Sequence, residues 1–350
     1  MKSYHDSMDE LRFTDAQKQA MTNRLLTAEP IPHRTLPRRR VVVAAAAAVL
    51  VLAVGTAGAT GVLRSAAESL SGLFGSSPAQ TEIIDQIGHP IGASDTDNGV
   101  TITADAILGD TYSYAIVYSI QRDDGQPLVE NMKPLNGCLP LSFETSGTSL
   151  GWAGGSHGSA YFYDADPTDP SIQYVEMMTA DEPVEAGTAR VKFQDLSVYD
   201  DDMRDKTIVA EGTWKLSFDA AFGNTSVSLP AGQAFQLSGM DAVLNSVSLS
   251  PLSIQVNYTV NSEVQWDKNA GSGKQNDHDR QQSRAYLESL PILLTFRDGS
   301  TLDMTNSGGG LHPEDGKTIC QKGEIFDQIH PLDEIVSVTV GDITLPVSQT

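Results

Sequence analysis

The stretch VTITADAILGDTYSYAIVYSIQ, residues 100–121, decides the fold class of this chain. Its first part, residues 100–108, alternates apolar and polar side chains, and residues 112–121 are rich in aromatic and β-branched residues. Gly109 and Asp110 supply turn chemistry between the two parts. This pattern is typical of two antiparallel strands joined by a turn. The stretch therefore predicts a β-hairpin.

Similar patterns recur along the rest of the chain, and short apolar runs alternate with clusters of Gly, Pro, Asp and Asn. The one helix candidate in this part is short and covers residues 280–290. Spacing of this kind favours β-sandwich architecture, and the length favours two such domains. We expect a mainly β protein with two β-sandwich-like domains, residues 81–222 and 223–350. The boundary falls near residues 221–233, although that stretch is equally compatible with a strand and a turn inside one large sandwich.

Charge is distributed unevenly along the chain, whose formal net charge is −22. Residues 1–40 contain eight basic and five acidic residues, residues 41–63 contain none, and residues 64–350 contain 15 basic and 40 acidic residues. This distribution predicts a membrane protein with a small basic end and a large acidic body. Because nucleic acids are bound mainly through Lys and Arg, the acidic body excludes nucleic acid as its partner.

The uncharged residues 41–63 predict a single transmembrane helix. As an α-helix they span roughly 34 Å at about 1.5 Å per residue, which covers a hydrocarbon core of about 30 Å. Arg38-Arg39-Arg40 directly precede the run, and clustered arginines stay on the cytoplasmic side. We therefore expect a single-pass protein of the cell membrane, with residues 1–40 in the cytoplasm and the C-terminus extracytoplasmic.

The competing interpretation is a signal peptide that is removed. Ala57-Gly58-Ala59 fits the small-residue cleavage pattern, with cleavage after Ala59, and the preceding arginines resemble a twin-arginine export signal. A charged segment of forty residues before the apolar run is long for a secretory signal, which favours a retained anchor.

The cytoplasmic segment contains FTDAQKQAMTNRLLTA, residues 13–28, which predicts a short amphipathic helix. Thr14 and Gln17 have the spacing of a capping box. Met21 and Leu25 belong to a weakly apolar face at helical spacing. A helix of about 14 residues is marginal alone in water, so we expect it to fold on a partner or on the membrane. The alternative is an inert tail with some helical bias.

Residues 64–80 predict a stalk that continues the membrane helix outward. Ala67, Leu70 and Phe74 recur at helical spacing. The run from Gly75 to Pro78 then breaks the helix.

A family resemblance rests on two blocks of sequence. Residues 73–94, LFGSSPAQTEIIDQIGHPIGAS, and residues 97–128 resemble the bacterial membrane-protein family called domain of unknown function 4179. The C-terminal stretches 249–260, 294–300 and 329–347 are similar to a second β-domain that often follows it. The resemblance implies a short cytoplasmic segment, one membrane helix and an extracytoplasmic β-rich region. It also implies an anti-sigma-factor-like role, with a sigma factor as the partner of the cytoplasmic segment, and it brings no catalytic residues.

Three sequence features contain side chains of the kinds used in catalysis or metal binding. Ser156 lies in a G-x-S-x-G pattern, but a nucleophile elbow needs a helix after it and a strand pattern follows here. The acidic loops 164–170 and 200–205 carry carboxylates of the kind that bind calcium, without the spacing of an EF-hand. The seven histidines show no zinc spacing. The sequence therefore predicts no catalytic, cofactor-binding or metal-ligating residue, and no enzyme.

Two further features leave alternatives open. Residues 267–282 are polar and Gly-rich, which predicts a long exposed loop that serves either as a recognition loop or as a mobile insertion. Cys138 and Cys320 either form one disulfide or remain two free thiols.

Two functions are compatible with these features. The first is a membrane protein that couples an extracytoplasmic β-rich sensor to a cytoplasmic helix and regulates transcription in the manner of an anti-sigma factor. The second is an anchored or secreted cell-envelope module for binding or adhesion, with no cytoplasmic role. In both cases the external ligand or protein is unknown.

Overall fold

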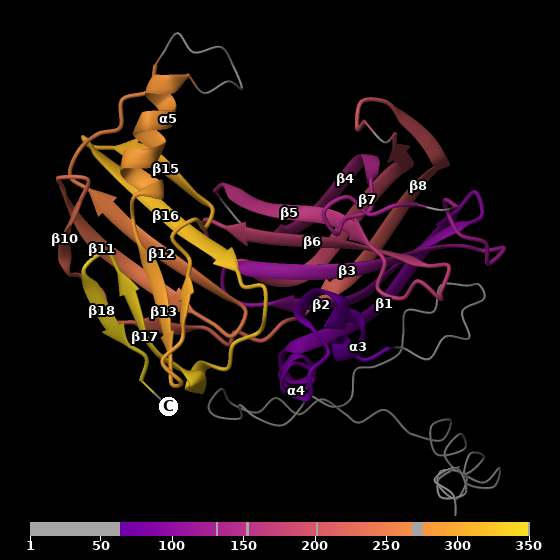
Figure 1. The fold of residues 1–350 in the computed structure, drawn as a ribbon, viewed down its shortest axis with the longest axis horizontal. Helices are drawn as coiled ribbons and strands as arrows, with labels where there is room; N and C mark the ends of the chain where they lie inside the picture. Colours follow the sequence, from indigo (N-terminus) through magenta and orange to yellow (C-terminus); the bar gives the residue numbers. More distant parts are fainter. Residues whose placement is uncertain (1–63, 131, 152–153, 201, 268–275, 349–350) are drawn as a thin grey trace, which may run out of the picture. The chain divides into compact units, whose positions relative to one another are not determined.

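The computed structural model describes residues 64–130, 132–151, 154–200, 202–267 and 276–348 (Figure 1). This part of the chain is mainly β, with several antiparallel sheets, which confirms the predicted fold class at that level. The predicted cytoplasmic segment and membrane helix, residues 1–63, lie outside the described residues. Within the described ranges, no helix has the length and apolar character needed to cross a membrane.

Two helices come first, and two sheets follow them. The helices are α3 (Ala66–Phe74) and α4 (Pro78–Ile87). The strands are β1 (Gly88–Asp97), β2 (Val100–Gly109), β3 (Ser113–Arg122), β4 (Leu141–Gly151), β5 (Ser156–Tyr163), β6 (Ile172–Ala180), β7 (Glu185–Tyr199) and β8 (Lys206–Ala220). They form a larger sheet in the order β1-β2-β3-β6-β5 and a smaller sheet in the order β4-β7-β8. The two sheets share one hydrophobic core around the fully buried Trp214 and Phe193.

A second pair of sheets occupies the rest of the chain. Its strands are β9 (Val227–Leu229), β10 (Ala234–Leu237), β11 (Met240–Leu249), β12 (Ser253–Val260), β13 (Ile292–Phe296), β14 (Thr301–Asp303), β15 (Gly309–Glu314), β16 (Lys317–Ile325), β17 (Ile335–Val340) and β18 (Ile343–Pro346). The larger sheet has the order β10-β11-β12-β16-β15, with β9 also paired to β11, and the smaller sheet has the order β14-β13-β17-β18. A separate hydrophobic core fills the space between them.

The two pairs of sheets are copies of one pattern. Each pairing in the β11–β12 hairpin repeats a pairing of the β2–β3 hairpin 140 residues earlier, so that Ala106↔Val117 becomes Ser246↔Asn257. The order β1-β2-β3-β6-β5 corresponds to β10-β11-β12-β16-β15, and β4-β7-β8 corresponds to β13-β17-β18. The chain therefore contains an internal structural duplication, which we call the first repeat (residues 88–220) and the second repeat (residues 227–346).

The repeats differ on the outer face of the larger sheet, the face turned away from the repeat's own core. In the first repeat this face is apolar and carries Ala106, Leu108, Ala115, Val117, Val175 and Met177. The matching pairings place Ser246, Ser248, Gln255, Asn257, Gln321 and Gly323 at the same positions of the second repeat. An apolar helix gains free energy by covering the first face and gains little on the second.

Helices α3 and α4 cover the apolar face of the first repeat. Leu70, Phe74 and Ile84 are buried in a cluster with the outer-face residues of β2 and β3. Residues 66–74 therefore belong to the folded body and do not form the free stalk that the sequence predicts over residues 64–80. The helical spacing and the break after Phe74 are as expected, but the apolar side of the helix packs on a sheet.

Residues 268–275 of the segment predicted as a loop, residues 267–282, lie outside the described residues, and the end of the segment is helical. Helix α5 (Asp277–Ser283) begins inside it, and the π-helical turn η1 (Arg284–Glu288) follows directly. Asn276 caps α5, because its side chain accepts a hydrogen bond from the backbone N–H of Asp279. The cap explains why a polar stretch adopts a helix here. A short 3-10 turn, η2 (Leu332–Glu334), precedes β17.

Each repeat places a charged side chain at one equivalent position, where Glu176 is partly buried and Lys322 is buried. Glu176 pairs with Ile116, and Lys322 pairs with Val256, at the equivalent position of the second repeat. The Glu176 carboxylate accepts hydrogen bonds from the Tyr114 hydroxyl at 2.7 Å and the Thr148 hydroxyl at 2.6 Å. Burial raises the pKa of Glu176.

Lys322 is only 1% exposed, and carbonyl oxygens surround its ammonium group. Its Nζ donates to the Leu287 carbonyl at 2.9 Å and to the Thr305 carbonyl at 2.5 Å. Since Leu287 lies in η1, the ammonium satisfies a carbonyl at a helix C-terminus, where a positive charge is favourable. Desolvation by burial nevertheless lowers the pKa of Lys322 to about 8.

Substituting Leu70 by Ala tests the packing of α3. Leu70 is fully buried, so we expect Leu70→Ala to lower the free energy of unfolding by about 2–5 kcal/mol. Leu73→Ala is the matched control, because Leu73 in the same helix is only partly buried. Urea unfolding of the two variants measures the difference, and equal losses would contradict the packing described.

The buried Lys322 predicts a distinctive pH dependence of stability. Its pKa in the folded state lies below the ordinary lysine value, so between about pH 8 and about pH 10 the unfolded chain binds more protons. The free energy of unfolding should therefore rise with pH in this window. Lys322→Met should flatten that rise, whereas Lys317→Met, at an exposed position of the same strand, should preserve it. Urea titrations across the window provide the measurement.

Candidate functional site

The start of α3 follows the predicted membrane span in the sequence and is held by several side-chain hydrogen bonds. Ser65 and Glu68 form a capping box, in which each side chain accepts a hydrogen bond from the other residue's backbone N–H at 3.1 Å. The Asp85 carboxylate of α4 accepts a third bond, from the Ala67 N–H, at 2.9 Å. Carboxylates at a helix N-terminus also interact favourably with the helix dipole. The first turn after residue 63 is thus held by three side chains.

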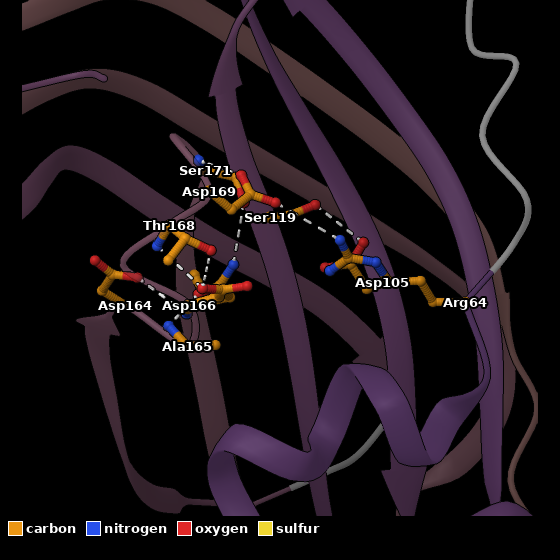
Figure 2. A network of polar contacts seen from close by, with 10 residues as sticks. Arg64, Asp105, Ser119, Asp164, Ala165, Asp166, Thr168, Asp169 and Ser171 are labelled. Atoms are coloured by element: carbon orange, nitrogen blue, oxygen red, sulfur yellow. Dashed lines mark hydrogen bonds and ion pairs between the residues drawn. The ribbon is translucent and has the colours of Figure 1, made fainter. Parts of the chain in front are cut away.

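Arg64, the first described residue, lies among carboxylates of the first repeat. Its guanidinium is 3.8 Å from the Asp169 carboxylate. Figure 2 shows Arg64 reaching toward Asp105 and toward the loop that carries Asp169. Because both partners of the Asp169 contact are partly exposed, this ion pair alone contributes little stability.

Asp105 sits at a β-bulge in the middle of β2. The pairing with β3 skips it, since Ala104 pairs with Tyr118 and Ala106 with Val117. A bulge adds one residue and redirects its side chain, which brings Asp105 to the same side of the sheet as Ala106. Burial raises the pKa of Asp105 to about 6, and a 3.0 Å hydrogen bond from Ser119 and the charge of Arg64 offset part of this rise.

The second repeat has the same bulge without the charge. Asn245 occupies the position of Asp105, and its side-chain amide donates to the Thr259 hydroxyl at 2.7 Å. Thr259 in turn corresponds to Ser119 in the first repeat. A neutral amide therefore meets the needs of the bulge, and a half-buried carboxylate is not required by the fold. The carboxylate is found in the repeat that Arg64 contacts.

The acidic loop 164–170 uses its carboxylates to shape its own backbone. Asp166 accepts hydrogen bonds from the Thr168 N–H at 3.0 Å and hydroxyl at 2.7 Å, and these bonds lower the pKa of Asp166. Asp164 and Asp169 accept from the backbone N–H two residues ahead of each. These contacts are turn interactions typical of Asp. Across the described ranges, no group of three or more His, Cys, Asp or Glu is placed to hold a metal ion.

The remaining sequence candidates are not brought together into one site. Ser156 begins strand β5, so the strand and helix of a nucleophile elbow do not flank it. His157 shares a 2.7 Å hydrogen bond with the Gly323 carbonyl of the second repeat. Cys138 and Cys320 are both free thiols, and burial raises the pKa of Cys320 to about 12. In the second acidic loop, Asp200 accepts a hydrogen bond from the Arg204 N–H at 2.9 Å.

The arrangement around Arg64 is suited to coupling the charge of Asp105 to the position of α3, because Arg64 lies beside Asp105 and directly precedes the helix. A carboxyl with a pKa of about 6 beside a guanidinium makes the local charge one unit more positive when it takes up a proton. Sequence reasoning missed this site. A signal exists in residues 104–108, where the polar and apolar alternation slips by one residue, but without the fold nothing links that slip to Arg64.

Substituting Asp105 by Asn tests how much the ionised carboxylate lowers the free energy of unfolding. The pKa is higher in the folded than in the unfolded state, so from about pH 4 to about pH 6 the folded protein binds more protons and its stability falls as pH rises. The Asn variant should lack this fall and be more stable than the parent at neutral pH. Asp219→Asn, at an exposed position of β8, is the control. Parallel curves for the parent and Asp105→Asn in denaturant titrations over this pH range would rule out the assignment.

Comparisons with known proteins match part of the chain to a family. No curated protein matches it. A solved structure, described as the conserved domain protein from Bacillus anthracis, is 15% identical, with a TM-score of 0.46, and the similarity covers 72% of this chain and 76% of that one. The model of a family described as a domain of unknown function, DUF4179, matches residues 37–122, from before the predicted span to the end of β3. This match confirms the resemblance to the DUF4179 family over residues 37–122.

Proposed function

We propose that the protein is a single-pass membrane protein whose extracytoplasmic β-rich region senses or binds a ligand and whose cytoplasmic segment regulates transcription in the manner of an anti-sigma factor. In this proposal residues 41–63 form the membrane helix, and residues 1–40 lie inside the cell. The two repeats are β-sandwich-like domains on the outside. A sigma factor is the partner of the cytoplasmic segment.

One observation carries the proposal: the folded body begins directly after the predicted span. The uncharged run ends at Leu63, Arg64 contacts Asp169, and Ser65 already caps α3. No flexible linker of Gly, Ser or Pro separates the two in the sequence. A displacement of α3 relative to the membrane therefore acts on the end of the predicted span.

Helix α4 extends this connection to the second repeat. The Gln80 side chain donates to the Ile329 carbonyl at 2.7 Å and accepts from the Ile329 N–H at 2.8 Å. Leu252 and Ile325 of the second repeat lie in the same hydrophobic cluster as Leu70. A ligand that favours one position of the helices over another shifts their equilibrium by its difference in affinity for the two states. Binding at either repeat can therefore bias α3.

The alternative function is an anchored or secreted binding or adhesion module without a cytoplasmic role. An open groove of about 570 Å³ on the outer face of the β4-β7-β8 sheet favours it, because such a surface is available to an external ligand. The two functions differ in what residues 1–40 do. They share the external binding surface.

The regulator proposal predicts that the full-length protein in membranes captures a sigma factor encoded beside it. Deleting residues 1–33 should abolish capture and leave the outer region folded. Met21→Asp together with Leu25→Asp should weaken capture, because these residues form the apolar face of the predicted helix. Affinity capture followed by mass spectrometry gives the readout.

The control for this experiment is the paired substitution Gln19→Asp and Asn23→Asp, on the polar side of the same predicted helix. It adds the same charge and should leave capture intact. Absence of any sigma factor in the capture, with the protein correctly inserted, contradicts the regulator and favours the binding module. A mature protein that begins near Thr60 contradicts both the anchor and the regulator.

A further inference from the structure

The outer face of the β4-β7-β8 sheet carries a cluster of basic side chains on a strongly acidic body. Lys192 of β7 pairs directly with Lys215 of β8, and Arg190 lies on the same face of β7. All three are exposed. Gly147 and Ser149 of β4 pair with Lys192 and Arg190 and leave space beside them. We call these three cations, with Gly147 and Ser149, the basic face.

Among the described residues, the cations of the basic face form no ion pair. The five ion pairs of the described residues involve other basic groups, namely Arg64, Arg122, Lys206, Arg280 and Arg284. Asp219, on the same face of β8, lies diagonally from Arg190 without forming an ion pair. The nearby Asp95 carboxylate accepts a hydrogen bond from the backbone N–H of Lys215 at 2.7 Å.

Like charges directly opposite each other across two strands are destabilising. The Lys192–Lys215 pair therefore costs stability in the free protein. The second repeat shows that the fold does not need this charge, because the corresponding strands β13, β17 and β18 contain no charged residue. On their outer face Thr295 pairs with Ser337. The fold does not require these cations, and an anion bound between them would offset their repulsion.

The groove of about 570 Å³ lies on this face. Its lining includes Arg190, Lys192 and Lys215 with the hydroxyl-bearing Ser149 and Ser217, and most of the lining surface is apolar. Hydroxyl and backbone groups of this kind hydrogen-bond to phosphate oxygens, and ammonium and guanidinium groups neutralise them. The groove runs over three adjacent strands, so it can hold an extended chain.

The geometry points to the basic face as the binding site of a phosphodiester-linked anionic polymer of the cell envelope. This inference rests on the proposed extracytoplasmic position of the β-rich region and supplies the ligand class that the proposed function leaves open. A thin polymer strand contacts the groove alone. A planar anionic membrane would also approach the rest of the body, which is acidic overall because residues 64–350 carry 40 acidic and 15 basic residues, and would be repelled.

The test uses the purified full-length protein in a neutral detergent and poly(glycerol phosphate) of defined length as the probe. Binding is measured by fluorescence anisotropy of the labelled polymer over a range of salt concentrations. Three phosphate contacts predict that log K falls against log salt with a slope of about −2. The triple variant Arg190→Gln, Lys192→Gln, Lys215→Gln should lose at least about tenfold in affinity at low salt and most of this slope.

The matched control is Lys133→Gln, Arg297→Gln, Lys317→Gln, which removes three exposed cations from other surfaces and changes the net charge equally. It should retain the affinity of the parent within about twofold, since these cations lie outside the groove. Equal losses in the two triple variants would overturn the inference. So would absence of binding by the parent, or binding to phosphatidylglycerol vesicles without binding to the free polymer.

Thermal unfolding separates a binding defect from a folding defect. Because the Lys192–Lys215 repulsion is removed, the basic-face variant should unfold at a temperature no lower than the parent. A variant that unfolds earlier is replaced by the single change Lys215→Gln, which should still weaken polymer binding more than Lys317→Gln. The measurement does not depend on topology, so a failed sigma-factor capture leaves it standing, and failed polymer binding leaves the regulator proposal standing.

Discussion

The apolar outer face of the first repeat is the constraint on which the rest of the body depends. Both repeats share strand order and pairing, but only the first presents Ala, Leu, Val and Met on this face. The hydrophobic gain from covering it fixes α3 and α4 there and not on the Ser, Asn and Gln of the second repeat. Once α3 is fixed, its N-terminus brings Arg64 beside Asp105. The candidate site is thus a consequence of which sheet face is apolar.

Much of the fold could be predicted from the sequence, because alternation and turn residues are local signals. The hairpin of residues 100–122, the strand-rich body and the end of a helix before Gly75 all follow from such signals. Helix α4 was missed, since Ser77 and Pro78 look like a break. In the structure they are the cap and the first position of a new helix, which is where proline is tolerated.

The duplication and the site could not be predicted for a physical reason. What the repeats share is pairing and bulge position, and these tolerate nearly any side chain with the right alternation. At five of the six outer-face positions the side chains even change from apolar to polar, and the sixth changes to Gly323, which removes sequence similarity where the structures agree. The site could not be predicted for a related reason. Arg64 and Asp105 meet only because a bulge turns Asp105 and a helix packs on the sheet. Neither the bulge nor the packing of the helix leaves a recognisable motif in the sequence.

The charges of Glu176 and Lys322 bear on how a chain with two similar halves folds correctly. Tandem copies of one fold risk exchanging strands, and β6 and β16 are the equivalent central strands of the two larger sheets. If β6 took the place of β16, the Glu176 carboxylate would face the carbonyl oxygens of Leu287 and Thr305 and find acceptors where it needs donors. Lys322 in the place of Glu176 would lose both its carbonyl partners. A buried charge without its partners is costly, so each strand is rejected by the wrong repeat. Opposite charges at one equivalent position thereby label the two halves and direct each strand to its own sheet.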